Sequence, residues 1–378
     1  MTKKWVNIAD VLFFQEGPGV RNTQYTTSGV KLLNVANLVD GKVDLSKSDR
    51  YISEEEAYGK YRHFLCDDGD FVIASSGIKV EYIDKKMGFV DASMLPLCMN
   101  TSTIRFKVLD ENQLRIRYFM YYLKSKHFKE QLTKQITGSA QLNYGPSHLK
   151  KMIMPLIDIT VQDEIISCMD KLQSIIETRQ RELIELDRLM KARFVEMFGD
   201  CTNMISLSEL CLIITDGTHQ SPKFQHDGIP FILVSNLSKN TVTYDTDKFI
   251  SAETYKELYK RTPIEIGDIL LSAVGSYGHP AVVVEDRKFL FQRHIAYLKP
   301  KSDILNSYYM HGALLSPGCQ RQIEEKVKGI AQKTLNLSEI RKIRIPVPSL
   351  DLQKQYADFV HQVNKSKVAV QKALDETQ

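Results

Sequence analysis

The sequence of 378 residues lacks several features that define large classes of protein. No run of 18 consecutive apolar residues occurs, so we predict no membrane-spanning segment. Asn7 and Asp10 interrupt the first apolar stretch before it reaches the length of a signal peptide. The six cysteines are scattered, without a CxxC pair or a Cys/His cluster at zinc-ligand spacing. We therefore expect a cytoplasmic protein with reduced, buried thiols and no membrane partner.

Motifs that hold catalytic cofactors are missing as well. Methyl transfer from S-adenosylmethionine to adenine calls for a glycine-rich cofactor turn and an Asn/Asp-Pro-Pro-aromatic loop, and neither string occurs. A GxxxxGK[ST] phosphate loop is also absent, which argues against ATP hydrolysis. The sequence therefore predicts no catalytic residue and no cofactor.

Two arrangements imitate catalytic or metal sites. Asp268, together with the Asp-Arg-Lys stretch at 286–288, resembles the carboxylates and lysine of a metal-dependent nuclease. However, Asp70 follows a glycine at the matching place in the first repeat, where no counterpart of the Asp-Arg-Lys stretch occurs. This favours a role for both aspartates in a turn at the start of a strand. His219 and His226 have no further ligands nearby in the sequence, so we expect them to bond DNA or solvent. We predict no metal site.

A repeat runs through the chain. The segment "GSAQLNYGPSHLKKMIMP" begins at Gly138, and "GIAQKTLNLSEIRKIRIP" begins 191 residues later at Gly329. Residues 138–166 and 329–357 share seven identities without a gap, where average residue usage would yield about two by chance. Upstream, "GVKLLNVANL" and "GDFVIASSG" match "GIPFILVSNL" and "GDILLSAVG" in the same order. Because the repeat is far too long for a solenoid, it indicates the tandem duplication of a whole domain.

Each repeat begins with short β-rich runs and continues into helices. Residues 113–132 and 304–327 have helical patterns, the second interrupted at Pro317. The stretch "AVVVEDRKFLFQRHIAYLKP" reads as a hairpin. We therefore predict an α+β protein with two similar domains, at residues 1–155 and 201–346.

A long helix is expected after each domain, at residues 156–200 and 347–378. No glycine or proline occurs between Thr160 and Phe198, so about 38 residues would form a rod of about 57 Å. The second helix is shorter, with no counterpart of residues 188–200. Each helix leaves its own domain, so the two are expected to pair as an antiparallel coiled coil with the domains at opposite ends, related by a pseudo-two-fold axis.

Apolar residues at spacings of three and four mark the contact face of the helix pair. Arg179 and Lys367 interrupt the two stripes. They either pin the register of the helices or extend to solvent from a loosely packed seam. The residues expected in the pair are Ile165, Met169, Leu172, Ile176, Leu183, Leu186, Met190, Tyr356, Phe359, Val363, Val370 and Leu374.

The order of these motifs carries a family resemblance over the whole chain. "DGTHQSP", "GIPFILVSNL", "GDILLS" and "GIAQ", followed by a coiled-coil helix, are present twice in degraded form. This pattern resembles the specificity subunit of type I restriction-modification systems. The resemblance implies two target recognition domains, each reading one half of a bipartite sequence in double-stranded DNA. It also implies a non-catalytic chain whose helices set the spacing and bind two methyltransferase subunits, with ATP-dependent restriction subunits joining through the complex.

If each domain reads bases, short polar or basic side chains on loops at one edge of the sheet should make the contacts. The candidates in the first domain are Arg21, Asn22, Gln24, Tyr25, Ser75, Ser76, Lys79, Ser139, Gln141, Asn143 and Tyr144. The candidates in the second are His219, Gln220, Ser221, Lys223, Ser276, Tyr277, His279, Gln332, Lys333, Thr334 and Asn336. The shared Gly-x-Ala-Gln is either a turn that places backbone amides near phosphate or a plain connection from helix to strand.

Two other functions fit the same sequence. One is a duplicated protein-binding scaffold that joins two polypeptides without touching nucleic acid. The other is a free-standing nuclease. Strong salt dependence of binding to duplex DNA would distinguish a DNA-binding specificity subunit from the scaffold, because a scaffold that binds only protein has no counterions to release from DNA.

Overall fold

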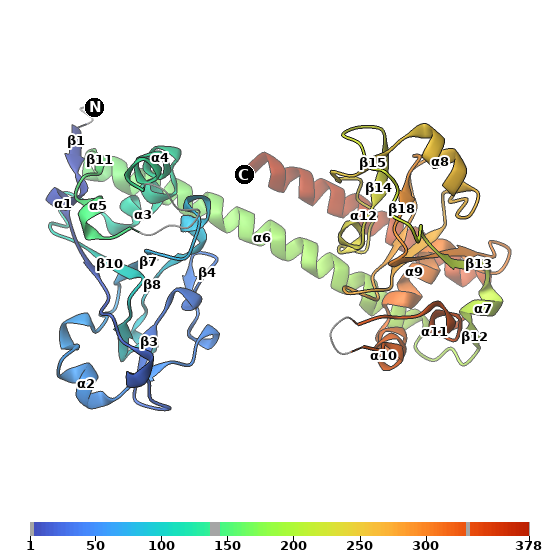
Figure 1. Ribbon diagram of the computed structural model, residues 1–378, viewed down its shortest axis with the longest axis horizontal. Coiled ribbons are helices and arrows are strands. Elements are labelled where there is room, and N and C mark those ends of the chain that lie inside the picture. The colour runs from blue at the N-terminus through green and yellow to red at the C-terminus, as the bar shows by residue number, and fades with distance from the viewer. Residues whose placement is uncertain (1–3, 137–143, 330–332, 378) are drawn as a thin grey trace. The chain divides into compact units, whose positions relative to one another are not determined.

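The computed structural model describes residues 4–136, 144–329 and 333–377 (Figure 1). They form two compact units, Met1–Ser174 and Ile175–Gln378. Helix α6 (Ile159–Phe198) begins in the first unit and ends in the second. Each unit mixes helices with small sheets, so the predicted α+β class is confirmed. None of the helices in the described ranges is both long and apolar enough to cross a bilayer.

The first unit opens with strands and closes with three helices before α6. Its elements are β1 (Lys4–Asn7), α1 (Ile8–Val11), β2 (Leu12–Glu16), β3 (Val30–Leu33), β4 (Leu38–Val39), β5 (Lys42–Val43), β6 (Tyr51–Ile52), α2 (Glu54–Tyr58), β7 (Phe71–Ala74), β8 (Met87–Phe89), β9 (Leu97–Met99), β10 (Thr103–Val108), α3 (Ile116–Lys124), α4 (Lys126–Gln135), α5 (Pro146–Leu149) and β11 (Ile153–Leu156).

The described residues of the second unit follow the same order, apart from the β4–β5 pair, and end in the long helix α12. Its elements are β12 (Met204–Ser206), α7 (Leu207–Leu210), β13 (Cys211–Asp216), β14 (Ile229–Ile232), β15 (Phe249–Ile250), α8 (Ala252–Tyr259), β16 (Ile269–Ser272), β17 (Pro280–Val282), β18 (Leu290–Phe291), β19 (Ile295–Pro300), α9 (Ser307–Leu315), α10 (Pro317–Lys326), α11 (Leu337–Arg341), β20 (Arg344–Pro346) and α12 (Leu350–Thr377).

The sheets of the two units have the same strand order. A four-stranded sheet runs β2-β10-β7-β8 in the first unit and β13-β19-β16-β17 in the second. A three-stranded sheet runs β6-β3-β9 and β15-β14-β18, each with one parallel pair. A two-stranded sheet joins β1 to β11 and β12 to β20. The repeat in the sequence is therefore a repeat of the fold.

The hairpin predicted for residues 281–300 is wrong. Strands β17 and β19 both pair with β16, whereas β18 pairs with β14 in the other sheet. The physical reason is burial, because Phe289, Leu290 and Phe291 between the two strands are at most 1% exposed and fill the interior of the unit. A turn at the surface would have exposed these side chains.

The cores are built by fully buried central strands and by one face of the helices. All four residues of β7 and of β16 are buried. Helix α3 buries its aromatic face, including Phe119, against this sheet. Ser125 separates α3 from α4 and caps α4 by accepting the N–H of Phe128, and Ser316 caps α10 in the same way. In each pair, a serine N-cap therefore begins the second helix where the chain turns.

A buried glutamine fastens the start of the first long helix. Gln162 in α6 is fully buried. Its Oε1 accepts the backbone N–H of Arg115 at 2.9 Å, just before α3. Its Nε2 donates to the carbonyl oxygens of Gln113 and Ile157, at 2.8 and 2.9 Å. One side-chain amide thus satisfies three backbone groups and joins α6 to the loop that precedes α3.

The second unit repeats this arrangement with different neighbours. Gln353, 191 residues after Gln162, is fully buried near the start of α12. Its Oε1 accepts the N–H of Asn306 at 2.9 Å, and its Nε2 donates to Ile304 and Pro348 at 3.1 and 3.0 Å. The residues that the two glutamines contact differ between the units, and only the glutamine itself is the same. The hydrogen bonds of its side chain therefore explain one identity of the repeat.

Another glutamine braces the two-stranded sheet beside each long helix. Gln131 of α4 accepts the N–H of Ile153 at 2.9 Å and donates to its carbonyl oxygen at 2.8 Å. Gln322 of α10 brackets Arg344 in the same way, at 3.0 and 2.8 Å. Each amide side chain bonds both backbone groups of one strand residue, as a neighbouring strand would. The helix pairs α3–α4 and α9–α10 are thus joined to the strands that precede α6 and α12.

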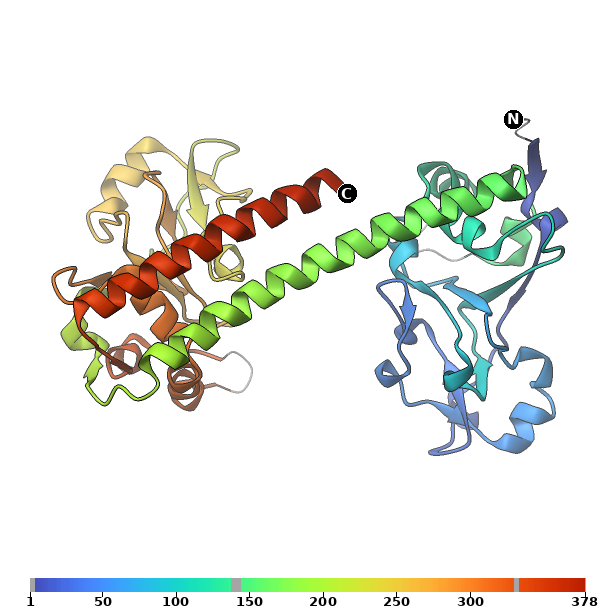
Figure 2. The ribbon, with the colours of Figure 1, turned by 180° about the vertical axis from the view of Figure 1, so that it is seen from behind.

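Helix α12 packs antiparallel against the C-terminal half of α6 (Figures 1 and 2). The Tyr356 hydroxyl donates to the carbonyl oxygen of Met190 at 3.2 Å, and its ring centroid lies 5.4 Å from that of Phe194. Further along α12, Lys367 forms an ion pair with Asp187 at 2.7 Å. The partner on α6 moves backward as α12 advances, which is the geometry of an antiparallel pair.

The two charged interruptions of the apolar stripes have different partners. Lys367 reaches across to α6, and its ion pair with Asp187 favours a role in setting the register. Arg179 instead pairs with Glu182 on its own helix at 2.7 Å. An exposed pair of this kind contributes little to stability.

The residues predicted for the helix pair differ in burial. Tyr356, Val363 and Leu374 are buried. Those of intermediate exposure are Ile176, Leu183, Leu186, Met190, Phe359 and Val370. Met169 and Leu172 are 36% and 37% exposed, and Ile165 packs against the core of the first unit. The first turns of α6 therefore belong to the first unit, and the close helix contacts lie nearer its C-terminal end.

We predict that Gln353→Ala strongly destabilises the second unit. The substitution takes the partner from three backbone groups in part-buried hydrogen bonds, and a group that stays buried and unsatisfied costs roughly 1–3 kcal/mol. Gln355→Ala, at an exposed position of the same helix, is the matched control and should change the free energy of unfolding by less than about 0.5 kcal/mol. Urea unfolding followed by circular dichroism measures both, and equal losses in the two variants would contradict the role of Gln353.

Candidate nucleic-acid interface

In each unit the central strand of the four-stranded sheet ends in an open turn. The turn after β7 contains Gly77, with φ 74°, and the turn after β16 contains Gly275, with φ 76°. Left-handed backbone of this kind favours glycine. No atom lies within 4 Å of the position where a Cβ would be added to either residue. The conformation of the turn, and not crowding, therefore requires glycine at these positions.

In each unit, one backbone hydrogen bond joins a residue of the repeated segment that begins at Gly138 or Gly329 to this strand end. The N–H of Tyr144 donates to Ser75 at 3.0 Å, and the N–H of Leu335 donates to Ala273 at 2.8 Å. Tyr144 and Leu335 are each 1% exposed. A buried residue at the same position of the repeat therefore lies beside the turn in both units.

Some of the predicted DNA contacts fall outside the described residues or on buried ones. Ser139, Gln141, Asn143 and Gln332 lie outside the residues that the structure describes. Burial argues against the predictions for Ser75 and Tyr144, which are 0% and 1% exposed. Both hydroxyls already have partners, since Ser75 donates to Glu16 at 3.2 Å and Tyr144 donates to Ala74 at 2.9 Å. Both hydroxyl groups therefore form hydrogen bonds inside the unit.

Two further candidates of the first unit make internal contacts. Gln24 donates to the Glu56 carboxylate at 2.6 Å and to the Tyr61 hydroxyl at 3.1 Å. The Tyr25 ring lies under the Arg50 guanidinium, whose carbon is 5.2 Å from the ring centroid. Both residues are half-buried, so these side chains first stabilise the loop on which they lie.

The remaining candidates of the first unit are accessible. Arg21, Asn22 and Lys79 are exposed, and Ser76 is half-buried. The hydrogen bond of Tyr144 to the residue before Ser76 places Tyr144 at the same strand end as this serine. Donor side chains on short loops at one edge suit contacts to phosphates and base edges.

The second unit holds a polar cluster at the end of β13. The Asp216 carboxylate, whose side chain is 18% exposed, receives Arg261 at 2.7 Å and His219 at 3.0 Å. The Arg261 and His219 side chains are about half exposed, at 51% and 52%. One carboxylate thus orients two donors toward solvent, and an arginine held in this way can still bind a phosphate or a guanine edge. Sequence analysis missed Arg261, since it lies 45 residues from Asp216.

The glycine after Asp216 explains the "DG" of the motif. A Cβ on Gly217 would lie 2.3 Å from the carbonyl oxygen of Phe291. Gly17 has the same place in the first unit, where a Cβ would lie 2.0 Å from the carbonyl oxygen of Asn100. Both glycines therefore let the end of the outer strand lie against the smaller sheet.

Several other candidates of the second unit lie on or beside the turn at Gly275. Lys333 lies over the Tyr277 ring, with 5.7 Å from Nζ to the centroid, and His279 contacts Asn240 at 3.0 Å through Nδ1. Thr334 bridges to Val274 at the strand end. The exposed candidates are Gln220, Ser221, Lys223, Ser276, Lys333 and Asn336. They offer donors and acceptors to a ligand at the surface.

The nuclease-like arrangement has a structural explanation. Asp268 is 3% exposed and accepts the Tyr297 hydroxyl at 2.9 Å and the N–H of Glu265 at 2.8 Å. Burial raises the pKa of this carboxyl. Asp70 has the equivalent place and accepts the N–H of Asp67 at 2.8 Å. The carboxylate closes the turn before the central strand in both units.

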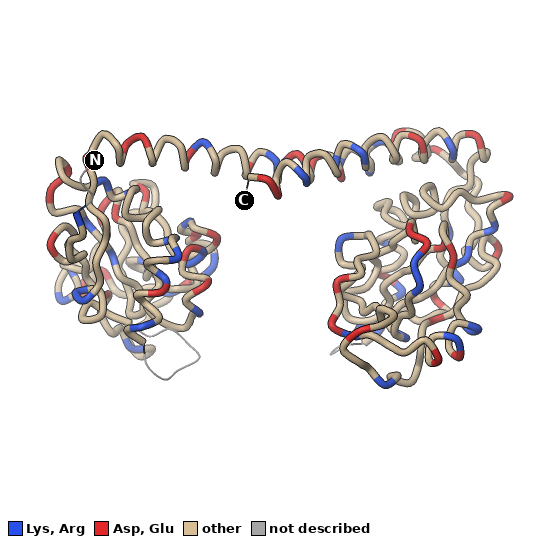
Figure 3. The backbone as a smooth tube through the Cα atoms, turned by 90° about the horizontal axis from the view of Figure 1, so that it is seen from above, with Lys and Arg blue, Asp and Glu red and all other residues tan. Residues whose placement is uncertain are grey.

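Charge and metal-binding groups are dispersed over the described residues. Within 4–136, 144–329 and 333–377, no three His, Cys, Asp or Glu side chains lie together as metal ligands. Figure 3 shows Lys and Arg interspersed with Asp and Glu along both units and the helices. Binding of a polyanion would therefore depend on local groups of cations, because the charge of +4 is spread over the chain.

Comparison with known proteins identifies a duplicated domain. The family described as type I restriction modification DNA specificity domain matches residues 18–188 and again residues 202–377. The specificity subunit of the type I restriction enzyme EcoBI from Escherichia coli is 31% identical over 137 residues, 36% of this chain and 29% of that protein. The type I MjaVIII specificity subunit from Methanocaldococcus jannaschii is 22% identical over 190 residues, 49% and 43% of the two chains. The chain spans less than half of either relative.

Two solved structures share the fold. The S subunit of a type I restriction-modification system from M. genitalium aligns with a TM-score of 0.52 at 15% identity, over 100% of this chain and 93% of that chain. A chain from a structure of type I R-M complex assembly aligns with a TM-score of 0.58 at 16% identity, over 99% and 93%. At these identities the likeness concerns the fold.

We predict that Arg261→Ala weakens binding to duplex DNA by about tenfold, or ~1.4 kcal/mol. The variant removes the guanidinium that Asp216 holds at the surface. Arg321→Ala, at an exposed position on α10, is the matched control. Fluorescence anisotropy with a labelled duplex measures both affinities, and an Arg261 variant that binds as tightly as the control would remove this cluster from the interface.

Proposed function

Because the chain belongs to the type I restriction modification DNA specificity domain family, we propose that it recognises DNA as the specificity subunit of a type I restriction-modification complex. Each unit reads one half of a bipartite target in double-stranded DNA. The chain selects the site, and partner subunits perform methylation and cleavage. The names of the relatives from E. coli and M. jannaschii support this assignment.

The single observation that carries the proposal is the duplication of the scaffold with different surfaces. Gln162 and Gln353 make equivalent hydrogen bonds, and so do Tyr144 and Leu335. The exposed and half-buried side chains around the two turns differ, with Ser76 and Lys79 in one unit and Ser276, Tyr277 and Lys333 in the other. A common frame with unlike contact residues suits two different half-sites.

We assign two roles to the long helices. They set the spacing of the half-sites, since a continuous helix of 40 residues corresponds to about 60 Å of rise. They also dock two methyltransferase subunits, and restriction subunits join through that complex. Exposed apolar side chains support docking, with Ile184 and Val195 of α6 at 53% and 49% and Val368 of α12 at 70% exposure. We place the whole complex in the cytoplasm.

We predict that exchanging residues 1–155 for the corresponding domain of a relative alters one half-site and leaves the other unchanged. The reason is that each unit has its own core and its own candidate contacts. Gel shifts with a panel of duplexes, in which each half is varied separately, measure the outcome. The reciprocal exchange of residues 201–346 is the control, and a change in both halves after either exchange would contradict independent reading.

A protein-binding scaffold is the rival function, and salt separates the two. We predict that the logarithm of the affinity of the chain and its methyltransferase partners for duplex DNA falls linearly with the logarithm of salt concentration, by about 0.9 for each phosphate contacted. A titration series in potassium chloride measures this slope. A slope near zero, or no binding to any duplex, would favour the scaffold.

A further inference from the structure

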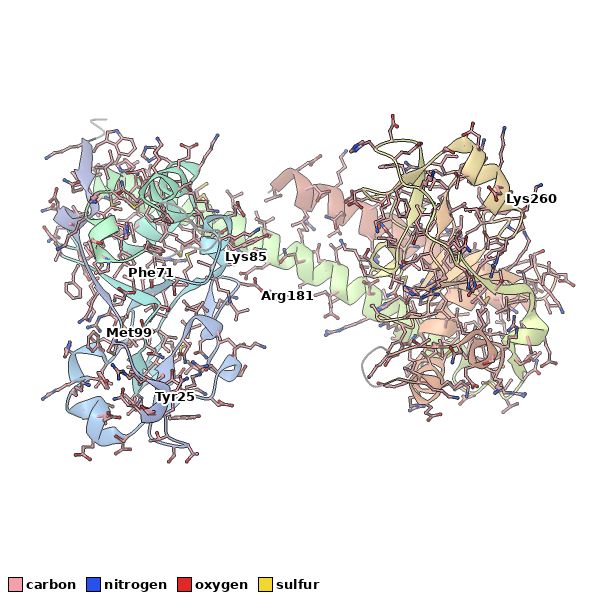
Figure 4. All side chains as sticks on the ribbon, viewed as in Figure 1. Tyr25, Phe71, Lys85, Met99, Arg181 and Lys260 are labelled. Carbon is pink, nitrogen blue, oxygen red and sulfur yellow. The ribbon has the colours of Figure 1, made fainter. Side chains whose placement is uncertain are left out.

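A basic cleft lies in the first unit beside the turn at Gly77. Its volume is about 580 Å³, and the residues that line it are Val39, Asp40, Gly77, Ile78, Lys79, Tyr82, Lys85 and Lys86. Lys85 is labelled in Figure 4, at the surface of the first unit. Of these residues, only Lys79 was among the predicted DNA contacts.

The cleft is built from two elements of the first unit that have no counterpart among the described residues of the second. One wall is the β4–β5 hairpin with its Asp40-Gly41 turn. The other is a 3-10 helix, η5 (Val80–Lys85), inserted between the turn and β8. In the second unit β17 already begins at Pro280, shortly after Gly275. The described residues there form no counterpart of either element, so the cleft belongs to one half of the repeat.

The walls of the cleft are held in place. Ile83 of η5 is fully buried in the core. Lys129 of α4 donates to the Asp84 carboxylate and to the carbonyl oxygen of Glu81, both at 3.2 Å. The N–H of Gly41 donates to the carbonyl oxygen of Lys85 at 3.2 Å, which joins the hairpin to the helix. The basic side chains therefore project from a fixed backbone, and this preorganisation favours binding.

The side chains in the cleft are available to a ligand. Lys79 and Lys85 are exposed, Lys86 is half-buried, and none of the three forms an ion pair with a described residue. Tyr82 is 49% exposed, and the Lys85 Nζ lies 5.7 Å from the centroid of its ring. Asp40 is the only acid that lines the cleft. Three lysines against one aspartate leave a net charge of +2, which suits a polyanion.

We propose that this cleft binds the phosphodiester backbone of DNA next to the half-site read by the first unit. The proposal rests on the proposed function. The three ammonium groups neutralise phosphates, and the Tyr82 hydroxyl adds a donor beside them. These contacts fix the position of the first unit on the duplex without selecting bases, because phosphates carry no sequence information. The second unit, which lacks the hairpin and η5, positions itself without such a cleft.

The direct test combines Lys79→Ala, Lys85→Ala and Lys86→Ala in the full chain bound to its methyltransferase partners. The expected result is weaker binding to every duplex and a salt slope smaller by about 0.9 for each lysine lost. The order of preference among half-site variants should not change. Lys126→Ala is the control, since that ammonium lies outside the cleft, on α4, with 90% of its side chain exposed.

A second variant changes the charge in the opposite direction. Asp40 has φ 48°, a conformation that asparagine tolerates well, so Asp40→Asn should leave the hairpin intact. Removing the one negative charge from the cleft should tighten binding to any duplex by about two- to fivefold at low salt, and the gain should vanish at high salt. Opposite effects of the lysine and aspartate variants would not arise from a purely structural role of these residues.

The outcomes separate this proposal from the broader one. Salt-dependent binding by the wild-type complex, with a slope unchanged in the triple lysine variant of equal melting temperature, overturns the cleft and leaves the proposed function standing. A wild-type complex that binds no duplex overturns both. A loss confined to some half-site sequences would show base reading in the cleft and would also overturn a phosphate site.

Discussion

The buried amide of one glutamine at the start of each long helix is the interaction on which the fold depends. The side chains of Gln162 and Gln353 are fully buried, and each forms part-buried hydrogen bonds with three backbone groups. When one partner of a buried hydrogen bond is lost, the remaining donor or acceptor is left unsatisfied, and its full desolvation penalty destabilises the fold. The start of each long helix is therefore fixed to its own unit, whatever residues line the surface loops.

This division between frame and surface has a functional consequence. Strand order, helix caps and buried amides are common to both units. The loops at the strand ends, the β4–β5 hairpin and η5 are not. Since the frame does not depend on the exposed side chains of these loops, those side chains can vary while the fold is kept. A protein that reads two different sequences with two copies of one domain needs this independence.

Much of the frame could be predicted from the sequence, and much of the site could not. The repeat, the α+β class and the antiparallel helices follow from apolar periodicity and from identities at a fixed spacing. The hairpin at 281–300 failed because adjacent apolar runs do not reveal which sheet each strand joins. Polar residues on loops gave candidate contacts, but Ser75 and Tyr144 are polar and buried. Arg261 escaped notice because its partner Asp216 is distant in the sequence.

The central claim is that two sibling units read two separate half-sites. The most direct test is to sequence DNA methylated by the complete complex and to derive the modified motif from all methylated positions. The account predicts two short defined blocks separated by an undefined gap of constant length. One uninterrupted motif, or two blocks separated by gaps of many lengths, would contradict it.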